Sequence, residues 1–395
     1  MGNPASLRYF LILLRTPGLQ ISRNPVNSGH SWQRALLVSR QARPHTDPMP
    51  DVPPLHRRRV RYQGTHPRHF KEKYKELDPL AYASEAEKVR ARGQTPAGTH
   101  RSIMVAEILT VLAPKPGERA LDATLGYGGH ARELLRRILP GGQLLGLDVD
   151  PLELPRTEAR LRAEGFGDDA LQVRRMNFGG LAGLVPQTGP FDLVLADLGL
   201  SSMQIDNPDR GFTFKVEGPL DLRLNPQKGR PASEFLRSLS EDALADLLAE
   251  NADEPLAGPL ARALATHPGP LETTIQLAEA LRAVLARDHG LERDDPQTRR
   301  TLQRTFQALR IAVNEEFKVL DQFLACLPRA LRLGGRVAIL SFHSGEDRRV
   351  KKAFQEGLRA GLYAEVADAP TRATFQEQLD NPRSKAAKLR WALRT

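Results

Sequence analysis

The sequence predicts an α/β protein, in which a doubly wound and mostly parallel sheet carries an inserted group of helices. Short, fully apolar stretches such as "FDLVLADL" (Phe191–Leu198) are typical of strands buried on both faces of a parallel sheet. They alternate with amphipathic helical patterns, which is the order of a doubly wound fold. The alternation stops at about Asn207, and no good strand pattern appears up to His289. We therefore expect a helical domain inserted into the sheet domain.

Length and composition set the class of protein. The chain has 395 residues, of which 40% are hydrophobic and 26% charged, enough for a large core and for two domains. Its formal net charge of +10 favours a polyanionic partner such as nucleic acid, although a merely basic surface would give the same sum. The single cysteine, Cys326, excludes an intrachain disulfide and a Cys-based zinc site, and its apolar helical setting indicates a buried filler. The longest apolar run, "YFLILL", is far too short to span a membrane, so no membrane partner is expected.

The N-terminal segment has an unusual composition. Residues 1–46 contain arginines and serines but no acidic residue and no lysine, which resembles an organelle transit peptide. The alternative is a misassigned start, with Met49 as the true first residue. In either case we expect residues 1–52 to be disordered. A cytoplasmic location is expected, or a mitochondrial or plastid one if the segment is a genuine transit peptide.

Residues 53–98 form a basic arm in this interpretation. Its segment "HRRRVRYQGTHPRHFKEKYKEL" (residues 56–77) carries five arginines and three lysines, interleaved with Tyr62, Phe70 and Tyr74. Cations neutralise phosphates and aromatic faces stack on unpaired bases, so the arm could bind RNA. It could equally be a solvated arm that packs its aromatic side chains on its own domain.

The elements of the sheet domain follow in order over residues 99–206. The patterns predict a helix, a strand that runs through a Gly-rich turn into a helix, a strand ending in acidic residues, a helix and two further strands, at residues 101–112, 119–138, 142–151, 155–165, 171–178 and 191–198.

The block over residues 207–299 is predicted to be helical. "SLSEDALADLLAEN" (Ser238–Asn251) reads as a helix that starts with a capping box of Ser238 and Glu241, and residues 273–287 form a second amphipathic helix. Residues 304–327 are expected to form one long helix with a continuous apolar stripe. Strands at 334–344 and 385–394 complete the sheet domain, which takes in residues 99–206 and 300–395.

The Gly-rich turn "LDATLGYGGHA" is the first candidate for a ligand site. Gly126, Gly128, Gly129 and His130 lie between a strand and a helix, where glycine lets the main chain approach a ligand and the helix offers free N–H groups. Asp148 follows about 20 residues later, where a ribose-binding carboxylate is expected. Both NAD and S-adenosylmethionine present a ribose in this way, so the turn alone leaves both cofactors open.

The end of the strand at Phe191–Leu198 bears on this choice. Asp197 ends the strand beside the place where a methyl donor would point, and a polar loop follows it. Many enzymes that methylate amino groups on bases carry Pro-Pro-aromatic after such an Asp, whereas this chain has Leu-Gly-Leu-Ser-Ser. A dehydrogenase would need a Tyr-x-x-x-Lys or a His–acid pair as its hydride site, and the sequence offers no convincing candidate.

Taken together, the motifs resemble the ribosomal RNA small subunit methyltransferase H family. Those that match, in the family's order between about His100 and Arg390, are "DATLGYGGHAREL", "GLDVDP", "DLGLSSMQIDNPDRGFTF", "GPLDLRLNP", "RTFQALRIAVNEE", "GGRVAILSFHSGEDRRVKK" and "NPRSKAAKLR". The chain departs from the family at Gly345, where leucine is usual, and in its basic arm. The resemblance implies a Rossmann-like class I S-adenosylmethionine-dependent methyltransferase sheet with an inserted helical domain for substrate recognition.

The resemblance also implies an activity and a set of site residues. The expected reaction is S-adenosylmethionine-dependent N4-methylation of a cytidine in the decoding region of small-subunit (16S) ribosomal RNA, on the RNA or on the 30S particle. Cofactor contacts are implied at Gly128, Gly129, His130, Asp148, Phe178, Asp197 and Gln204. Asp197 is also the candidate catalytic residue, as an acceptor for an N4 proton, although it could serve only to bind cofactor.

The target base must leave its stack to reach such a pocket. The residues expected to line its site are Asp221, Arg223, Arg310, Asn314, Ser341, His343 and Ser344, with structural roles as the alternative for Arg310, Asn314 and His343. No metal is expected, and a homodimer is an open expectation. Two competing hypotheses remain at this point, a non-catalytic RNA-binding ribosome-assembly factor and an NAD-dependent dehydrogenase on a Rossmann fold.

Overall fold

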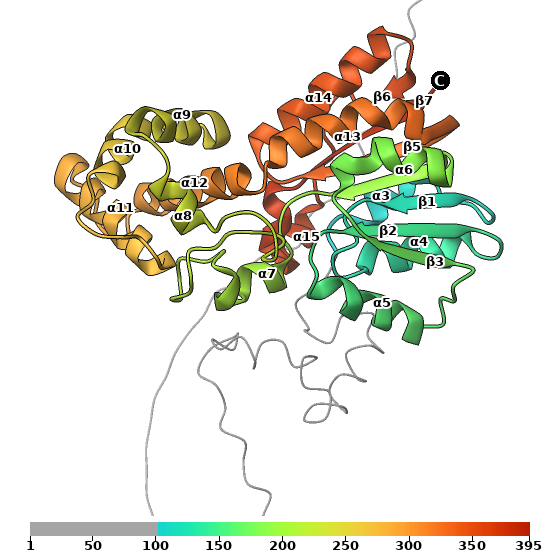
Figure 1. Cartoon of the computed structure of the whole chain (residues 1–395). Coiled ribbons are helices and arrows are strands. Elements are labelled where there is room, and N and C mark those ends of the chain that lie inside the picture. The colour runs from blue at the N-terminus through green and yellow to red at the C-terminus, as the bar shows by residue number, and fades with distance from the viewer. Residues whose placement is uncertain (1–101) are drawn as a thin grey trace, which may run out of the picture. The chain divides into compact units, whose positions relative to one another are not determined.

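A seven-stranded sheet organises the described part of the chain, residues 102–395 of a computed structural model (Figure 1). The expected N-terminal extension (residues 1–52) and basic arm (residues 53–98) lie outside the described residues. The strands are β1 (Arg119–Asp122), β2 (Gln143–Asp148), β3 (Leu171–Arg175), β4 (Phe191–Asp197), β5 (Leu331–Ser341), β6 (Tyr363–Val366) and β7 (Lys388–Arg394).

The strand order is β3-β2-β1-β4-β5-β7-β6, which reverses direction between β1 and β4. Strands β1 to β5 are parallel, and β7 lies antiparallel between β5 and β6. The predicted α/β class is therefore confirmed. Strand β6 was not predicted, because only Tyr363 and Val366 of its four residues are buried, which is too short a pattern to identify.

Helices cover both faces of the sheet. Alternate residues of β4 belong to different cores, with Val194 and Ala196 on one face and Leu193 and Leu195 on the other. The first face packs against α6 (Leu181–Thr188), α13 (Glu316–Ala330) and α14 (Ser344–Arg359). The second packs against α3 (Val105–Leu112), α4 (Gly129–Ile138) and α5 (Glu153–Ala163). This double coverage explains why β4 reads as a continuous apolar run.

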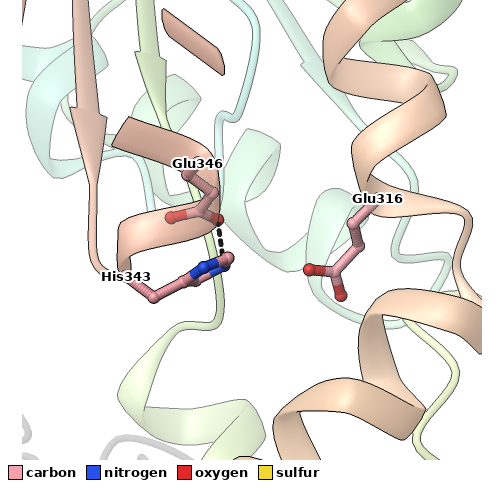
Figure 2. A group of neighbouring side chains, drawn as sticks. All are labelled: Glu316, His343 and Glu346. Carbon is pink, nitrogen blue, oxygen red and sulfur yellow. Dashed lines mark ion pairs between the residues drawn. The ribbon is translucent and has the colours of Figure 1, made fainter. Parts of the chain in front are cut away.

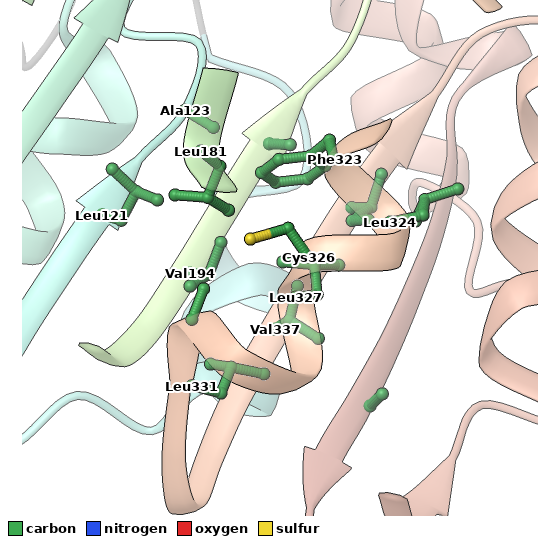
Figure 3. Packing of buried hydrophobic residues seen from close by; sticks show 14 of the residues in the cluster. Leu121, Ala123, Leu181, Val194, Phe323, Leu324, Cys326, Leu327, Leu331 and Val337 are labelled. Carbon is green, nitrogen blue, oxygen red and sulfur yellow. The ribbon is translucent and has the colours of Figure 1, made fainter. Parts of the chain in front are cut away.

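Cys326 lies within the first of these cores (Figure 3). Its side chain projects from α13 among Leu181, Val194, Leu327 and other apolar groups, and the residue is buried. Burial raises the pKa of its thiol. Cys326 is the buried filler that its helical setting predicted.

Between β4 and β5, the described residues form helices and loops with no strand. The main helices are α8 (Ala232–Arg237), α9 (Glu241–Ala252), α10 (Ala257–Ala265), α11 (Thr274–His289) and α12 (Pro296–Val313). They share a third apolar core, distinct from the two beside the sheet. The expected boundary between residues 299 and 300 falls inside α12, and Leu302, Phe306 and Leu309 pack in this third core.

The start of α9 differs from the prediction. Its N-cap is Ser240, whose hydroxyl accepts the N–H of Ala243 at 3.2 Å. Ser238 instead ends α8 and donates its hydroxyl to the carbonyl of Phe235 at 2.7 Å. The predicted capping box of Ser238 and Glu241 is therefore wrong, because the second serine of "SLSED" is the one that starts the helix.

The long helix predicted over residues 304–327 is also wrong, because two helices occupy this stretch. Helix α12 ends at Val313, and α13 begins at Glu316 after Glu315 adopts the left-handed conformation with φ 50°. The apolar stripe serves two cores, with Phe306 in the core of the inserted helices and Leu320 beside the sheet. No helix among residues 102–395 is long and apolar enough to cross a membrane.

Candidate cofactor and substrate cavity

A cavity of about 430 Å³ opens at the carboxyl ends of the parallel strands. Segments that follow all five of these strands contribute to its wall, including Gly126 after β1, Asp148 at the end of β2, Phe178 after β3, Asp197 at the end of β4 and His343 after β5. Doubly wound sheets bind ligands at this edge, where the strand order reverses. A cavity of this volume is within the range of small-molecule sites.

The glycines of the turn after β1 differ in what they contact. Gly126 borders the cavity and donates its N–H to Asp148 Oδ2 at 2.8 Å. Gly129 also borders the cavity, and a Cβ there would collide with the hydroxyl of Ser102. Gly128, an expected cofactor contact, does not line the cavity. It has φ 79°, and a Cβ would lie 2.9 Å from Thr157 Cγ2, so glycine is needed there for packing against α5.

Asp148 sits where a ribose-binding carboxylate is needed. Its two oxygens accept the N–H groups of Gly126 and Asp150, at 2.8 and 2.9 Å. Burial raises the pKa of this carboxyl, while the two main-chain donors act against that rise. The carboxylate is therefore fixed in orientation and borders the cavity. Each oxygen keeps a lone pair with which it can accept a hydroxyl.

His130 and Asp197 both border the cavity and lie close to each other. His130 Nε2 lies 3.5 Å from Asp197 Oδ2, and the imidazole is buried whereas the Asp197 side chain is 30% exposed. Burial acts to lower the pKa of His130, but Asp197 and Asp122 outweigh it and the pKa is raised. The N–H of Asp197 donates to Thr124 Oγ1 at 2.6 Å, which fixes the end of β4 beside the turn.

Asp122 is a further acidic residue that interacts with His130 and Asp197, and the sequence did not single it out. It ends β1 and is 1% exposed. Burial raises its pKa to about 7, against the lowering effects of His130 and of the Thr124 N–H. The only signal in the sequence was a polar residue at the end of an apolar strand, directly before the Gly-rich turn.

Gln204 borders the cavity but is held by the protein. Its amide oxygen accepts the N–H of Ser201 at 3.0 Å, in a capping box that starts α7 (Ser202–Asp206). Its amide nitrogen donates to Asp150 Oδ2 at 2.9 Å. Asp150 is fully buried, and Arg210 donates to the same oxygen at 2.7 Å. The hydrogen bonds from Arg210 and Gln204 lower the pKa of Asp150 against the effect of burial.

Arg210 connects Asp150, next to the Asp148 side of the cavity, to the loop that lines the other end of the cavity. Besides Asp150, its guanidinium donates to the carbonyls of Arg223 and Leu224, at 3.3 and 2.8 Å. Asn314 holds the same loop from the opposite side. It accepts the N–H of Leu224 and donates to the carbonyl of Leu222, both at 2.8 Å. Leu224 itself borders the cavity. Asn314 also borders the cavity, so its hydrogen bonds fit the structural alternative and its contact with a substrate stays a prediction.

Charged side chains line the end of the cavity away from the Gly-rich turn. Arg310 forks onto Glu316, with Nε and Nη2 at 2.8 and 2.9 Å from the two carboxylate oxygens, across the break between α12 and α13. His343 Nε2 lies 3.2 Å from Glu346 Oε1, and Glu346 Oε2 accepts the N–H of Phe342 at 2.8 Å. The sequence singled out Arg310 and His343 but not the two glutamates.

Three of these groups could hold a metal ion by geometry alone. Glu316 points from α13 toward His343 and Glu346 at the start of α14 (Figure 2), and one donor atom of each lies within 4.8 Å of the other two. The fork of Arg310 on Glu316 already supplies a positive charge at this point.

A Cβ on Gly345, where the resembled family usually has leucine, would lie 2.5 Å from Phe317 Cζ, so Phe317 occupies that space.

The other four residues expected to line the substrate site lie outside the cavity wall. Arg223 forks onto Asp221 at 2.8 and 2.6 Å. Ser341 is buried beside β7 and donates to the carbonyl of Lys388 at 3.4 Å. Ser344 donates to Asp253 at 2.9 Å. In each case a local partner or the sheet holds the side chain away from the space that the sequence suggested.

The fold and the cavity define the class of enzyme. A parallel sheet of this order, with a Gly-rich turn after β1 and acids at the ends of β2 and β4 around one cavity, is that of an S-adenosylmethionine-dependent methyltransferase. The MraW methylase family matches residues 97–395, and the chain belongs to this family. Its cofactor is S-adenosylmethionine, which the placement of Asp148 and the glycines fits.

Relatives with curated names match nearly their full lengths. The chain is 50% identical over 350 residues to ribosomal RNA small subunit methyltransferase H 1 of Lachnoclostridium phytofermentans, covering 88% of this chain and 95% of the relative. It is 52% identical over 340 residues to ribosomal RNA small subunit methyltransferase H 2 of Alkaliphilus metalliredigens, covering 85% and 97%.

Proposed function

We propose that this protein transfers a methyl group from S-adenosylmethionine to the exocyclic N4 of a cytidine in the decoding region of 16S ribosomal RNA. The observation that carries the proposal is one continuous cavity, with the Asp148 carboxylate at one end and a wall of buried and partly buried charged groups at the other. The names of the relatives support small-subunit ribosomal RNA as the substrate.

The donor end of the cavity would hold the cofactor. Asp148 would accept the ribose hydroxyls, the ring of Phe178 would pack on the adenine, and the main chain of Gly126 and Gly129 would border the methionine part. Phe178 is held edge-on by Phe323, with ring centroids 5.1 Å apart. When bound, S-adenosylmethionine supplies an electrophilic methyl carbon. Gln204 acts through Asp150 and the α7 cap, as a positioning residue beside this site.

Asp197 is the proposed catalytic residue. The N4 lone pair of cytosine is delocalised into the ring, so the amine attacks well only when its nitrogen becomes pyramidal. An acceptor for one N4 proton favours that geometry. When the N–C bond forms and the C–S bond breaks with its electrons left on sulfur, N4 would become positively charged and would have to lose one of its own two protons. Asp197 receives this proton or passes it to solvent, and His130 keeps the carboxylate in place.

The far wall would recognise the target base. Cytosine presents one donor group and two acceptors on its pairing edge, which a wall with both cationic and anionic groups can match. Arg310 and His343 are the candidate donors, and Glu316 and Glu346 are the candidate acceptors. Alignment of the amine with the methyl carbon at near-attack distance is the main source of rate in such a displacement.

Further parts of the proposal concern the partner and the setting. The small-subunit particle, rather than free RNA, is the proposed form of the substrate, and the basic arm of residues 56–77 is a proposed second contact to it. A homodimer and a cytoplasmic location are proposed on the resemblance alone. Residues 207–299, extended to the end of α12, are the proposed substrate-recognition domain.

The test is methyl transfer to small-subunit RNA or 30S particles by wild-type protein and by Asp197→Ala. We expect the substitution to lower kcat by about 10²- to 10⁴-fold, with the melting temperature close to that of wild type. Asp192→Asn, at the opposite end of β4, is the matched control and should keep its turnover. Undiminished methylation by Asp197→Ala would remove Asp197 from the chemistry. A wild-type protein that binds RNA without turnover would favour an assembly factor.

A further inference from the structure

The cavity must offer the unstacked target base an aromatic face, and the sequence after Asp197 supplies none. Extruded bases are held by stacking between aromatic or apolar side chains. The inference below rests on the proposed function and names the residue that provides this face. Four aromatic side chains border the cavity, namely Tyr127, Phe178, Phe317 and Phe342.

Three of these rings already have partners. The guanidinium of Arg160 lies over the ring of Tyr127, 3.5 Å from its centroid. Phe178 begins a short 3-10 helix after β3, borders the cavity and packs edge-on against Phe323. The third ring, Phe317, carries the guanidinium of Arg349 at 3.6 Å from its centroid. Each of these rings would have to give up a contact before a base could stack on its occupied face.

Phe342 differs from the other three rings, because no aromatic or cationic side chain among the described residues is found in contact with its ring. It directly follows β5 and packs on one side against the apolar core below the sheet, while it is only partly buried. Phe342 also borders the cavity. A ring supported from below and open toward a cavity is the arrangement that a stacking platform needs.

The sheet places Phe342 beside the proposed methyl acceptor site. Asp197 pairs with Leu340 across β4 and β5, and Leu198 donates its N–H to the Leu340 carbonyl at 3.0 Å. Beyond the ends of the strands, Gly199 lies close to Phe342, since a Cβ on Gly199 would be 3.7 Å from Phe342 Cδ2. The ring therefore stands next to the loop in which other base-amino methyltransferases carry their aromatic residue.

The main chain of Phe342 is also fixed. Its N–H donates to Glu346 Oε2 at 2.8 Å, and Glu346 is 4% exposed. His343, the next residue, borders the cavity and lies 3.2 Å from the other oxygen of Glu346. Glu346, itself part of the cavity wall, thus holds both the main chain of Phe342 and the side chain of His343.

We propose that Phe342 is the platform on which the target cytosine stacks, supplied by β5 in place of an aromatic residue after Asp197. Besides its proposed contact with the base, Glu346 then positions Phe342 through the Phe342 main-chain N–H. The platform is sequence-tolerant, because every base has a π face, so base identity is read by the charged groups and not by the ring.

The first experiment compares Phe342→Leu with Phe354→Leu. Phe354 lies on α14 in the core beside the sheet, with its ring centroid 5.6 Å from that of Tyr363, and does not border the cavity. Phe342→Leu should raise KM for small-subunit RNA roughly 5- to 150-fold, with the calorimetric Kd for S-adenosylmethionine unchanged. Phe354→Leu should leave both constants unchanged. Equal KM values for Phe342→Leu and wild type would overturn the proposal.

The second experiment does not depend on turnover. Phe342→Trp should retain methylation, and its emission, taken as the difference from wild type, should be quenched by RNA that contains the target nucleotide. RNA with an abasic residue at that position should cause no quenching. Quenching by both RNAs, or by neither while RNA still binds, would overturn the stacking role. If the wild-type protein has no turnover but only RNA with the target nucleotide quenches the Phe342→Trp emission, the proposed function fails and the stacking role of Phe342 stands.

Discussion

The two ends of the cavity are built from different chemistry. At the donor end, glycine main chain and the Asp148 carboxylate form the wall, and the hydrogen bonds run to backbone N–H groups. At the acceptor end, charged side chains from separate helices pair with one another, as Arg310 does with Glu316 across the α12–α13 break. The first arrangement fits any adenosyl donor. The second is the proposed site of the RNA base, so substitutions should separate donor binding from RNA binding.

The largest expected effect falls on the link between the two ends. Arg210→Gln leaves the fully buried Asp150 without its charged partner, so we expect a loss of about 3–5 kcal/mol in the free energy of unfolding. Urea denaturation measures it. Arg262→Gln removes an exposed pair with Glu241 and should cost about 0–1 kcal/mol. Similar losses for the two variants would contradict the structural weight given to the buried pair.

The stability from this pair also depends on pH. The folded-state pKa of Asp150 is lowered by Arg210 and Gln204 against burial, so the carboxylate stabilises the fold above its unfolded-state pKa. That contribution is lost as pH falls through the lowered pKa. In Asp150→Asn/Arg210→Gln, the loss of stability on acidification should be smaller than in wild type. Parallel pH profiles of the unfolding free energy would contradict this assignment.

A smaller effect separates the two ends directly. Arg310→Lys keeps the positive charge but cannot form the two-pronged contact with Glu316, so the acceptor wall should loosen. We expect KM for RNA to rise by about tenfold, which corresponds to roughly 1.4 kcal/mol, with Kd for S-adenosylmethionine unchanged. Titration calorimetry and initial rates give the two constants. Equal weakening of both ligands would mean that the two ends are not separable.

Gly128→Ala should have a modest effect on the donor end. The residue has φ 79° and faces Thr157 and Leu161, so an added methyl group strains the backbone and presses on α5. We expect a loss of about 1–3 kcal/mol in unfolding free energy. Gly258→Ala, on α10 with nothing within 4 Å of its Cβ position, is the control and should not destabilise. A neutral Gly128→Ala would argue that the turn is more adaptable than its packing suggests.

The smallest effect is expected from the N-terminus. Removal of residues 1–48 should leave turnover on small-subunit RNA within twofold of the full chain, since the family match begins only at residue 97. Initial rates of the two proteins, side by side, provide the check. A large loss of activity would assign a function to this segment and would contradict the expectation of a dispensable extension.

The donor end could be predicted from the sequence because its parts are local. A turn of a few residues and one acid at a fixed distance identify it, and the structure brings Gly126, Gly129 and Asp148 together as expected. The packing of Gly128 against α5 could not be predicted, because it depends on a helix some 30 residues further along the chain. Asp122 was missed because its unusual environment arises from burial among other charges.

The acceptor end could be predicted only in part. Its apolar period continues through Asn314 and Glu315, so no pattern in the sequence marks the break that turns Arg310 toward Glu316. Arg223 and Ser344 were expected in the cavity, but their nearest partners are Asp221 and Asp253, outside its wall. Pairing between charged side chains from distant segments is decided by the tertiary structure, which periodicity does not encode.

The central claim is that a cytidine amine receives the methyl group at the acceptor end. The most direct measurement is mass spectrometry of nucleosides from unmethylated small-subunit RNA, or its 30S particle, after incubation with this protein and S-adenosylmethionine. The account predicts N4-methylcytidine at one position, absent from the reaction with Asp197→Ala. A methyl group on another atom or base, or no methylation of either substrate by the wild-type protein, would contradict it.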